Sequence, residues 1–211
     1  MKGNIACYIA FCFCHWAGAQ TTGGLEQYFY VRKGSALTPV LIAHVQNEKW
    51  YGEVRYNYEE IKTFSAYAGK IFSDEQKTHS YSIIPIIGIV TGKFKGYSLG
   101  LDVTFTENNF FFCSQSQYTF SSNDHYENFM YSWSELGYEA SQWIYAGLAL
   151  QHLQLFQKEG EPMSYDFGAM IGFKLGKWTI PIYSFSPINN NRYFILGLNL
   201  EFGKNNNTHI R

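Results

Sequence analysis

The stretch NRYFILGLNLEFGK, residues 191–204, decides the fold, because it alternates strictly between two kinds of side chain. One set of positions is apolar throughout: Phe194, Leu196, Leu198, Leu200 and Phe202. The intervening positions are Ile195, Gly197, Asn199 and Glu201. Successive side chains of a β-strand point to opposite sides of a sheet. The pattern therefore predicts a strand with one apolar face and one mostly polar face.

The same alternation recurs over most of the chain and predicts about twelve strands. Many of them are close to ten residues long, which is the length that a tilted strand needs to cross a bilayer. The predicted strands are 24–32, 37–46, 49–58, 61–72, 79–91, 96–105, 109–120, 127–139, 142–156, 163–175, 177–185 and 192–202.

Three segments depart from the pattern. Pro85 and Pro181 lie inside predicted strands, although proline cannot donate a hydrogen bond to a ladder, so we expect a local irregularity or a bulge near a rim at each. Between Trp133 and Tyr138 the apolar phase shifts by one residue, which also predicts a bulge.

The connections between the predicted strands alternate in length from TGKFK (91–95) onward. A closed antiparallel barrel with short turns at one end and longer loops at the other produces this alternation. The predicted outer loops are KGSALT, EE, TGKFK, SSNDHYE, QKEGEP and SPINNN. Two early connections fit less well, because EE is short for an outer loop and SDEQKTH is long for a turn.

The N-terminus has the three parts of a secretory signal peptide. Lys2 supplies a positive charge, an apolar stretch follows, and Ala17-Gly18-Ala19 fits a cleavage site. We therefore expect residues 1–19 to be a signal peptide, 20–203 to be one barrel domain, and 204–211 to be a flexible polar tail. The alternative is that the first residues form a buried helix or strand. Three of the four cysteines lie in this segment, which leaves Cys113 as a small, mostly apolar strand residue.

The composition limits the functional classes. The formal net charge is −1, with no basic excess, which argues against nucleic acid as a partner. Aromatic residues make up 19% of the chain, yet its mean hydropathy is slightly below zero. No apolar run long enough for a transmembrane helix follows the N-terminal segment. Half-buried strands account for this combination better than helices do.

Two all-β architectures remain. An all-β, antiparallel up-and-down transmembrane barrel of about twelve (10–12) strands would turn its apolar face to lipid, because only closed barrels and helices satisfy the backbone within hydrocarbon. A soluble secreted barrel or sandwich would turn the apolar face inward. The length and number of strands, the aromatic content and the last strand favour the transmembrane barrel.

The last strand also resembles the closing strand by which outer-membrane barrels are recognised during assembly. That pattern is roughly polar-x-Gly-x-x-apolar-x-aromatic, and Gly197, Leu200 and Phe202 match it. Ile195 stands where the pattern has a polar residue, and further residues follow Phe202. The resemblance implies that outer-membrane lipid and the barrel assembly machinery are partners.

A second resemblance rests on residues 39–72 and 189–202. These stretches are similar to a group of small outer-membrane β-barrel proteins of Gram-negative bacteria, with the hallmark W-Y-x-E-x-R-Y-N-Y-E followed by T-x-S-x-x-x-G-K. The matching residues are Trp50, Tyr51, Glu53, Arg55, Tyr56, Asn57, Tyr58, Glu59, Thr63, Ser65, Gly69 and Lys70. The resemblance implies a barrel fold and a location in the outer membrane. It carries over no activity and no functional residue.

The candidate functional residues are the polar side chains expected inside the barrel. On strand 49–58 we expect Tyr56 and Tyr58 to face lipid, which would place the intervening residues in the lumen. The lumen candidates are Glu53, Arg55, Asn57, Glu59, Asp102, Asp166, Lys174, Asn199 and Glu201, together with Glu135, Glu139 and Gln151. Charges enclosed there must be paired or hydrated.

Three functions remain open. The first is a structural or accessory barrel in the cell envelope, with a lumen filled by paired charges and a protein partner that the sequence does not identify. The second is a passive pore for ions or small polar solutes. The third is a lipid-modifying enzyme, which needs a nucleophile and a base at one rim. We find no catalytic motif, metal-ligand cluster or cofactor motif, and expect a non-enzyme without cofactors.

Overall fold

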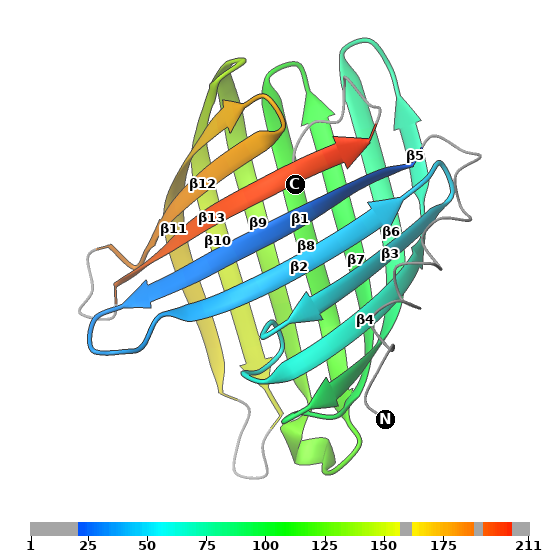
Figure 1. Cartoon of the computed structure of the whole chain (residues 1–211), viewed down its shortest axis with the longest axis vertical. Coiled ribbons are helices and arrows are strands. Elements are labelled where there is room, and N and C mark those ends of the chain that lie inside the picture. The colour runs from blue at the N-terminus through cyan, green and yellow to red at the C-terminus, as the bar shows by residue number, and fades with distance from the viewer. Residues whose placement is uncertain (1–20, 157–161, 188–191, 204–211) are drawn as a thin grey trace, which may run out of the picture.

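The computed structural model describes residues 21–156, 162–187 and 192–203. The predicted signal peptide (1–19) and polar tail (204–211) lie outside the described residues. The described chain forms one large antiparallel sheet (Figure 1). Its elements are β1 (Thr22–Arg32), β2 (Thr38–Gln46), β3 (Trp50–Tyr56), β4 (Thr63–Lys70), β5 (Phe72–Glu75), β6 (His79–Gly92), β7 (Gly96–Glu107), β8 (Phe110–Ser121), η2 (His125–Glu127), β9 (Phe129–Ser141), β10 (Ile144–Leu155), β11 (Met163–Leu175), β12 (Trp178–Phe185) and β13 (Tyr193–Gly203).

The sheet closes on itself as an up-and-down barrel. Neighbours in sequence pair except for β4 and β5, and β1 pairs with β13 from Thr22↔Gly203 to Arg32↔Tyr193. Figure 1 shows this closure as the blue β1 beside the red β13. Because β4 and β5 both pair with β6, they occupy one position in the wall. The wall therefore has twelve strand positions, which confirms the predicted all-β barrel and its strand number.

The two ends of the barrel differ in the length of their connections. At one end, β2–β3, β5–β6, β7–β8, β9–β10 and β11–β12 are joined by two or three residues, whereas the opposite connections are longer in five of six cases. Two expectations about connections were wrong. SDEQKTH is not a long turn, because β5 takes part of it and leaves only Gln76–Thr78. The connection predicted as EE runs over 57–62.

Both irregular prolines lie in the wall, in mid-strand rather than near a rim. Pro85 stands in β6 close to the break between β4 and β5, where the Ile71 N–H turns away and donates to the Lys49 carbonyl oxygen (2.9 Å). At Pro181 the pairing of β12 with β13 skips from Thr179↔Asn199 to Ile182↔Leu196. The ladder opens locally because proline has no N–H to donate.

The bulge predicted between Trp133 and Tyr138 is wrong. The register of β9 is continuous there against both β8 and β10, and the register shift falls at Ile144/Tyr145 instead. The apparent change of phase arises because Tyr131 and Trp133 point inward rather than toward lipid.

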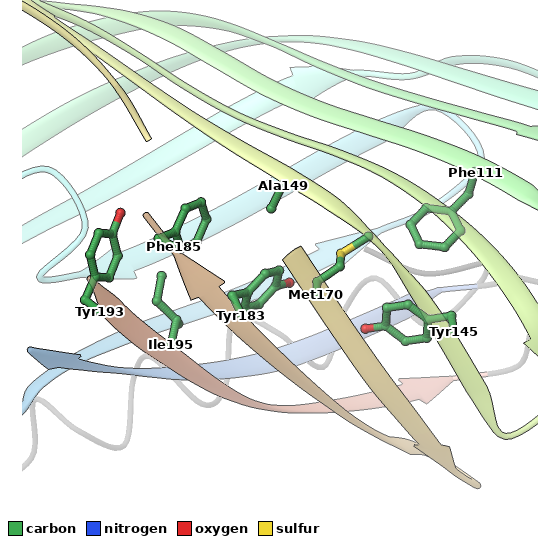
Figure 2. Packing of buried hydrophobic residues seen from close by; sticks show 8 residues of the cluster. All are labelled: Phe111, Tyr145, Ala149, Met170, Tyr183, Phe185, Tyr193 and Ile195. Atoms are coloured by element: carbon green, nitrogen blue, oxygen red, sulfur yellow. The ribbon is translucent and has the colours of Figure 1, made fainter. Parts of the chain in front are cut away.

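The outer wall is apolar and the inner wall is mixed. On β13, Phe194 is 49% exposed, whereas its neighbour Ile195 is 1% exposed. The described residues contain no helix with the length and apolar character needed to cross a bilayer. Inside, one cluster of buried side chains lies on β8 and β10–β13 (Figure 2). Its members are Phe111, Tyr145, Ala149, Met170, Tyr183, Phe185, Tyr193 and Ile195.

Candidate functional site

Arg55 on β3 forms the centre of a buried polar cluster and is 1% exposed. Its Nε donates to Glu53 Oε1 (2.5 Å) and its Nη1 donates to Gln117 Oε1 (2.6 Å). Nη1 also lies 3.6 Å from Glu59 Oε1 in an ion pair. Gln117 belongs to β8, four positions around the wall from β3. The Arg55–Gln117 bond therefore crosses the barrel interior.

Two tyrosine rings complete the surroundings of this guanidinium. Its carbon lies 4.3 Å from the Tyr58 ring centroid and 4.1 Å from that of Tyr67. Cations are attracted to the faces of aromatic rings, most strongly where water is excluded. The interior thus binds the Arg55 cation by a combination of carboxylates and ring faces.

The turn after β3 is shaped by Asn57 and brings the Tyr58 side chain into the interior. Asn57 has φ 60°, accepts a hydrogen bond from the Lys62 N–H (2.7 Å) and donates to the Pro39 carbonyl oxygen (3.0 Å). Asn57 therefore shapes the turn rather than lining the lumen on the strand face. Beyond it, the Tyr58 hydroxyl donates to Gln115 Oε1 (2.8 Å). The expectation that Tyr58 faces lipid was wrong, because the chain turns at Asn57.

Burial raises the pKa of the Tyr58 phenol well above its usual range, while the Arg55 guanidinium opposes this rise. At neutral pH the hydroxyl is therefore protonated and able to donate its hydrogen bond. The carboxylate of Glu59 accepts hydrogen bonds from Ser65 Oγ (2.8 Å) and the Tyr67 hydroxyl (2.7 Å). This group of side chains ties the turn to the inner wall.

A chamber of about 100 Å³ lies in the interior next to this cluster. Its acidic lining residues come from four different strands and are Glu26, Glu53, Asp102 and Glu135. Its aromatic lining residues are Tyr28, Tyr30, Tyr58, Tyr131 and Trp133. No lysine or arginine is found among the described residues of the lining. The chamber is therefore both acidic and aromatic.

Glu26 belongs to a chain of polar contacts along β1, β2 and β13. The Tyr28 hydroxyl donates to Glu26 Oε2 (2.8 Å), and Asn199 Nδ2 donates to the Tyr28 hydroxyl oxygen (3.1 Å). His44 Nδ1 lies 3.4 Å from Glu26 Oε1 and its Nε2 lies 3.8 Å from Glu201 Oε2. These contacts join the two strands that close the barrel.

Glu135 on β9 is held by neutral donors. Trp133 Nε1 and the Tyr183 hydroxyl both donate to Glu135 Oε1, each at 2.7 Å. Tyr183 lies on β12, three positions around the wall from β9, so this bond also crosses part of the interior.

The other predicted lumen residues lie away from the chamber lining. Asp166 accepts hydrogen bonds from Ser186 Oγ (3.2 Å) and the Tyr193 hydroxyl (3.1 Å). Lys174 Nζ donates to Glu139 Oε1 (2.9 Å). Gly197 is on the inner face of β13, and Phe202, 50% exposed, is on the outer face. The role of Gly197, Leu200 and Phe202 as an assembly signal stays a prediction.

Sequence reasoning missed the inward-pointing aromatics of the chamber. Alternation places Tyr131 and Trp133 on one face of their strand but does not say which face is the inner one. The signal that could have placed them is the phase of Leu136 and Tyr138 farther along β9. Both are exposed on the outer wall, and an uninterrupted strand then turns Tyr131 and Trp133 inward.

Within residues 21–156, 162–187 and 192–203, no group of three or more His, Cys, Asp or Glu side chains could hold a metal ion.

Comparison with known proteins gives a likeness of fold. No family model matches the chain, and no curated protein sequence matches it. Among solved structures, the KdgM porin has a TM-score of 0.59 at 11% identity, covering 85% of this chain and 99% of the porin. The same porin "in complex with disordered oligogalacturonate" has a TM-score of 0.61 at 12% identity, with the same coverage. The NanC porin has a TM-score of 0.59 at 8% identity, covering 85% and 99%. At these identities the likeness shows a shared barrel fold, that of the porins.

Proposed function

We propose that this chain is an integral barrel of the Gram-negative outer membrane whose interior is a narrow passage for small polar solutes, with a preference for cations. The observation that carries the proposal is the charge of the chamber. Four carboxylates line it, of which Glu53 is paired with Arg55, and its described lining holds no lysine or arginine. A passage lined by one sign of charge concentrates solutes of the opposite sign.

The location follows from the outer wall and the closed sheet. Closure gives every described strand except the four-residue β5 a partner on both sides, as hydrocarbon requires of a spanning sheet. The exposed outer face is rich in large apolar side chains such as Ile89, Leu148 and Phe167. The likeness of fold to porins supports the same location and fits a protein that is not an enzyme.

The acidic chamber argues against an acidic oligosaccharide as the solute. One structure of similar fold is described as a complex with oligogalacturonate, a polymer of acidic sugars. In this chain the carboxylates of the lining other than Glu53, which is paired with Arg55, would repel such a polyanion. We therefore propose that this chain passes cationic solutes, although its fold resembles that of a porin solved with an anionic oligosaccharide.

Planar-bilayer recording tests the channel. The refolded protein, checked by its heat-modifiable migration on a gel, is recorded under a potassium chloride gradient. We expect conductance steps whose reversal potential shows cation preference. Asp102→Asn should reduce that preference, because it removes a charge from the chamber, whereas Glu107→Gln at the exposed end of β7 should not. Anion preference, or an inserted barrel that does not conduct, would contradict the proposal.

A sealed structural barrel is the second candidate, favoured by the contacts that cross the interior. Arg55 binds Gln117 and Glu135 binds Tyr183 between strands that are not neighbours, and Tyr58, in the connection after β3, binds Gln115 on β8. If these contacts close the passage completely, the inserted barrel will give no conductance. A role for such a barrel beside other envelope proteins would then be the better proposal.

A further inference from the structure

Glu135 is a buried carboxylate without a cationic partner among the described residues. It is 6% exposed, and both of its donors, Trp133 Nε1 and the Tyr183 hydroxyl, are neutral and bind the same oxygen, Oε1. Among the described residues, no Lys, Arg or His forms an ion pair with it, and none donates to Oε2. A buried carboxylate is costly unless a positive group compensates it. The hydrogen bonds from Trp133 and Tyr183 favour the ionised form of Glu135, and a cation in the chamber would stabilise that form further.

The aromatic lining favours one kind of cation. Tyr28, Tyr131 and Trp133 line the chamber together with Glu26 and Glu135. Aromatic faces attract ammonium groups, and quaternary ammonium most characteristically, because such groups lose little hydration when they enter an aromatic site. Small metal cations prefer sites built from many oxygens. The lining therefore suits an organic ammonium ion better than an alkali ion.

Arg55 shows the same recognition within the same interior. Its guanidinium lies between the Tyr58 and Tyr67 rings and is bound by Glu53 and Glu59. Two carboxylates and two aromatic rings thus already hold one organic cation of the chain itself. The chamber presents the same two kinds of side chain to a solute.

The size of the chamber limits the ligand. Its volume is about 100 Å³, and one water needs about 10–15 Å³ of such space. A group of a few heavy atoms fits, whereas a sugar oligomer does not fit without movement of side chains. We propose that the chamber binds small organic ammonium ions of the size of choline. The transport of such ions rests on the proposed function, but their binding does not require an open passage.

Calorimetric titration of the refolded barrel in detergent tests the site, with choline as the probe. The control ligand is 3,3-dimethyl-1-butanol, which has the shape of choline without its charge. We expect saturable binding of choline. The alcohol should bind at least about tenfold more weakly, because the carboxylates attract only the charged ligand. Glu135→Gln keeps an oxygen for Trp133 and Tyr183 but removes the charge, and should weaken choline binding by about tenfold.

Two further variants distinguish a loss of the site from a loss of the fold. Glu107→Gln, on the exposed end of β7, should bind choline as the unchanged protein does. Tyr131→Leu removes a ring without touching Glu135 and should weaken choline binding by several-fold. Equal binding of choline and the neutral alcohol would overturn the proposal, as would binding that both Glu135→Gln and Tyr131→Leu leave unchanged.

The outcomes separate this site from the proposed channel. A barrel that binds choline but does not conduct would refute the channel and keep the site. A barrel that conducts cations but does not distinguish choline from the alcohol would keep the channel and refute the site.

Discussion

At the scale of single residues, Arg55 supplies the positive charge that compensates buried carboxylates in the interior. It compensates Glu53 and Glu59, both of which have nearly fully buried side chains. Replacing both partners of a buried pair can be tolerated, but removing one leaves an uncompensated charge in a medium that solvates it poorly. Substitution of Arg55 should therefore lower the stability of the barrel strongly, whereas substitution of a charged residue at the surface should lower it little.

Arg55→Met should lower the free energy of unfolding by about 3–5 kcal/mol, because it leaves two buried carboxylates without their cation. Urea unfolding in lipid vesicles, followed by tryptophan fluorescence, measures the loss. The control is Lys93→Met, whose partner Glu60 lies at 3.3 Å with both side chains exposed, and whose loss should cost about 1 kcal/mol or less. Adding Glu59→Gln to Arg55→Met should restore part of the stability. Equal losses for Arg55→Met and Lys93→Met would contradict this role of Arg55.

At the scale of elements, the closing strand β13 fits its neighbours through one glycine. A Cβ atom on Gly197 would stand 2.5 Å from Pro181 Cγ and 2.8 Å from Tyr28 Cε1. The proline ring of β12 and the tyrosine ring of β1 thus occupy the space that a side chain would need. Close packing against these two rings therefore explains why a glycine stands at position 197, independently of its match to the assembly pattern.

Gly197→Ala should destabilise the barrel by about 1–3 kcal/mol, because an extra methyl group must displace two rings. The fraction of heat-modifiable, folded protein as a function of urea reports this loss. The matched control is Gly52→Ala on β3, where the nearest side-chain atom, Val45 Cγ1, is at an ordinary 3.6 Å. Combining Gly197→Ala with Pro181→Ala should recover stability. A Gly197→Ala protein as stable as Gly52→Ala would show that the rings move freely.

The local sequence pattern predicted the strands of the wall, but not the turns and breaks within them or the direction of their aromatic side chains. A period of two is visible in any strand with unlike faces, so all twelve wall positions could be predicted. The turn at Asn57 and the break at Ile71 depend on a left-handed residue and on a proline in a partner strand, which alternation does not report. The direction of Tyr58 was misjudged, and that of Tyr131 and Trp133 was not predicted, because aromatic rings suit both lipid and a filled lumen.

At the scale of the whole molecule, the apolar face proves to be the outer one. Ile89, Leu148 and Phe167 are each more than 60% exposed on the outer wall. A soluble barrel would place polar residues there, so this exposure separates the two architectures that alternation alone left open. The contacts across the interior could not be predicted, because they depend on which strands the closed wall sets opposite each other.

Leu148→Arg should destabilise the barrel in lipid vesicles by about 2–4 kcal/mol, because Leu148 lies in mid-strand on the lipid face. Leu37→Arg is the control, since Leu37 is 58% exposed but belongs to the connection before β2, where water is available. Equilibrium unfolding by urea in vesicles compares the two. Similar small effects at both positions would favour the soluble architecture.

The pairing of β1 with β13 has a consequence for how the chain reaches its fold. The other ladders join strands that follow each other along the chain or, for β4 and β6, are separated only by the short β5, but this one joins the first described strand to the last. It cannot form until nearly the whole polypeptide has been made, and its loop-closure entropy is the largest in the molecule. Until then, two strand edges stay open and can pair with other chains. The seam is therefore among the last ladders that can form, and until it forms the incomplete barrel needs protection from aggregation.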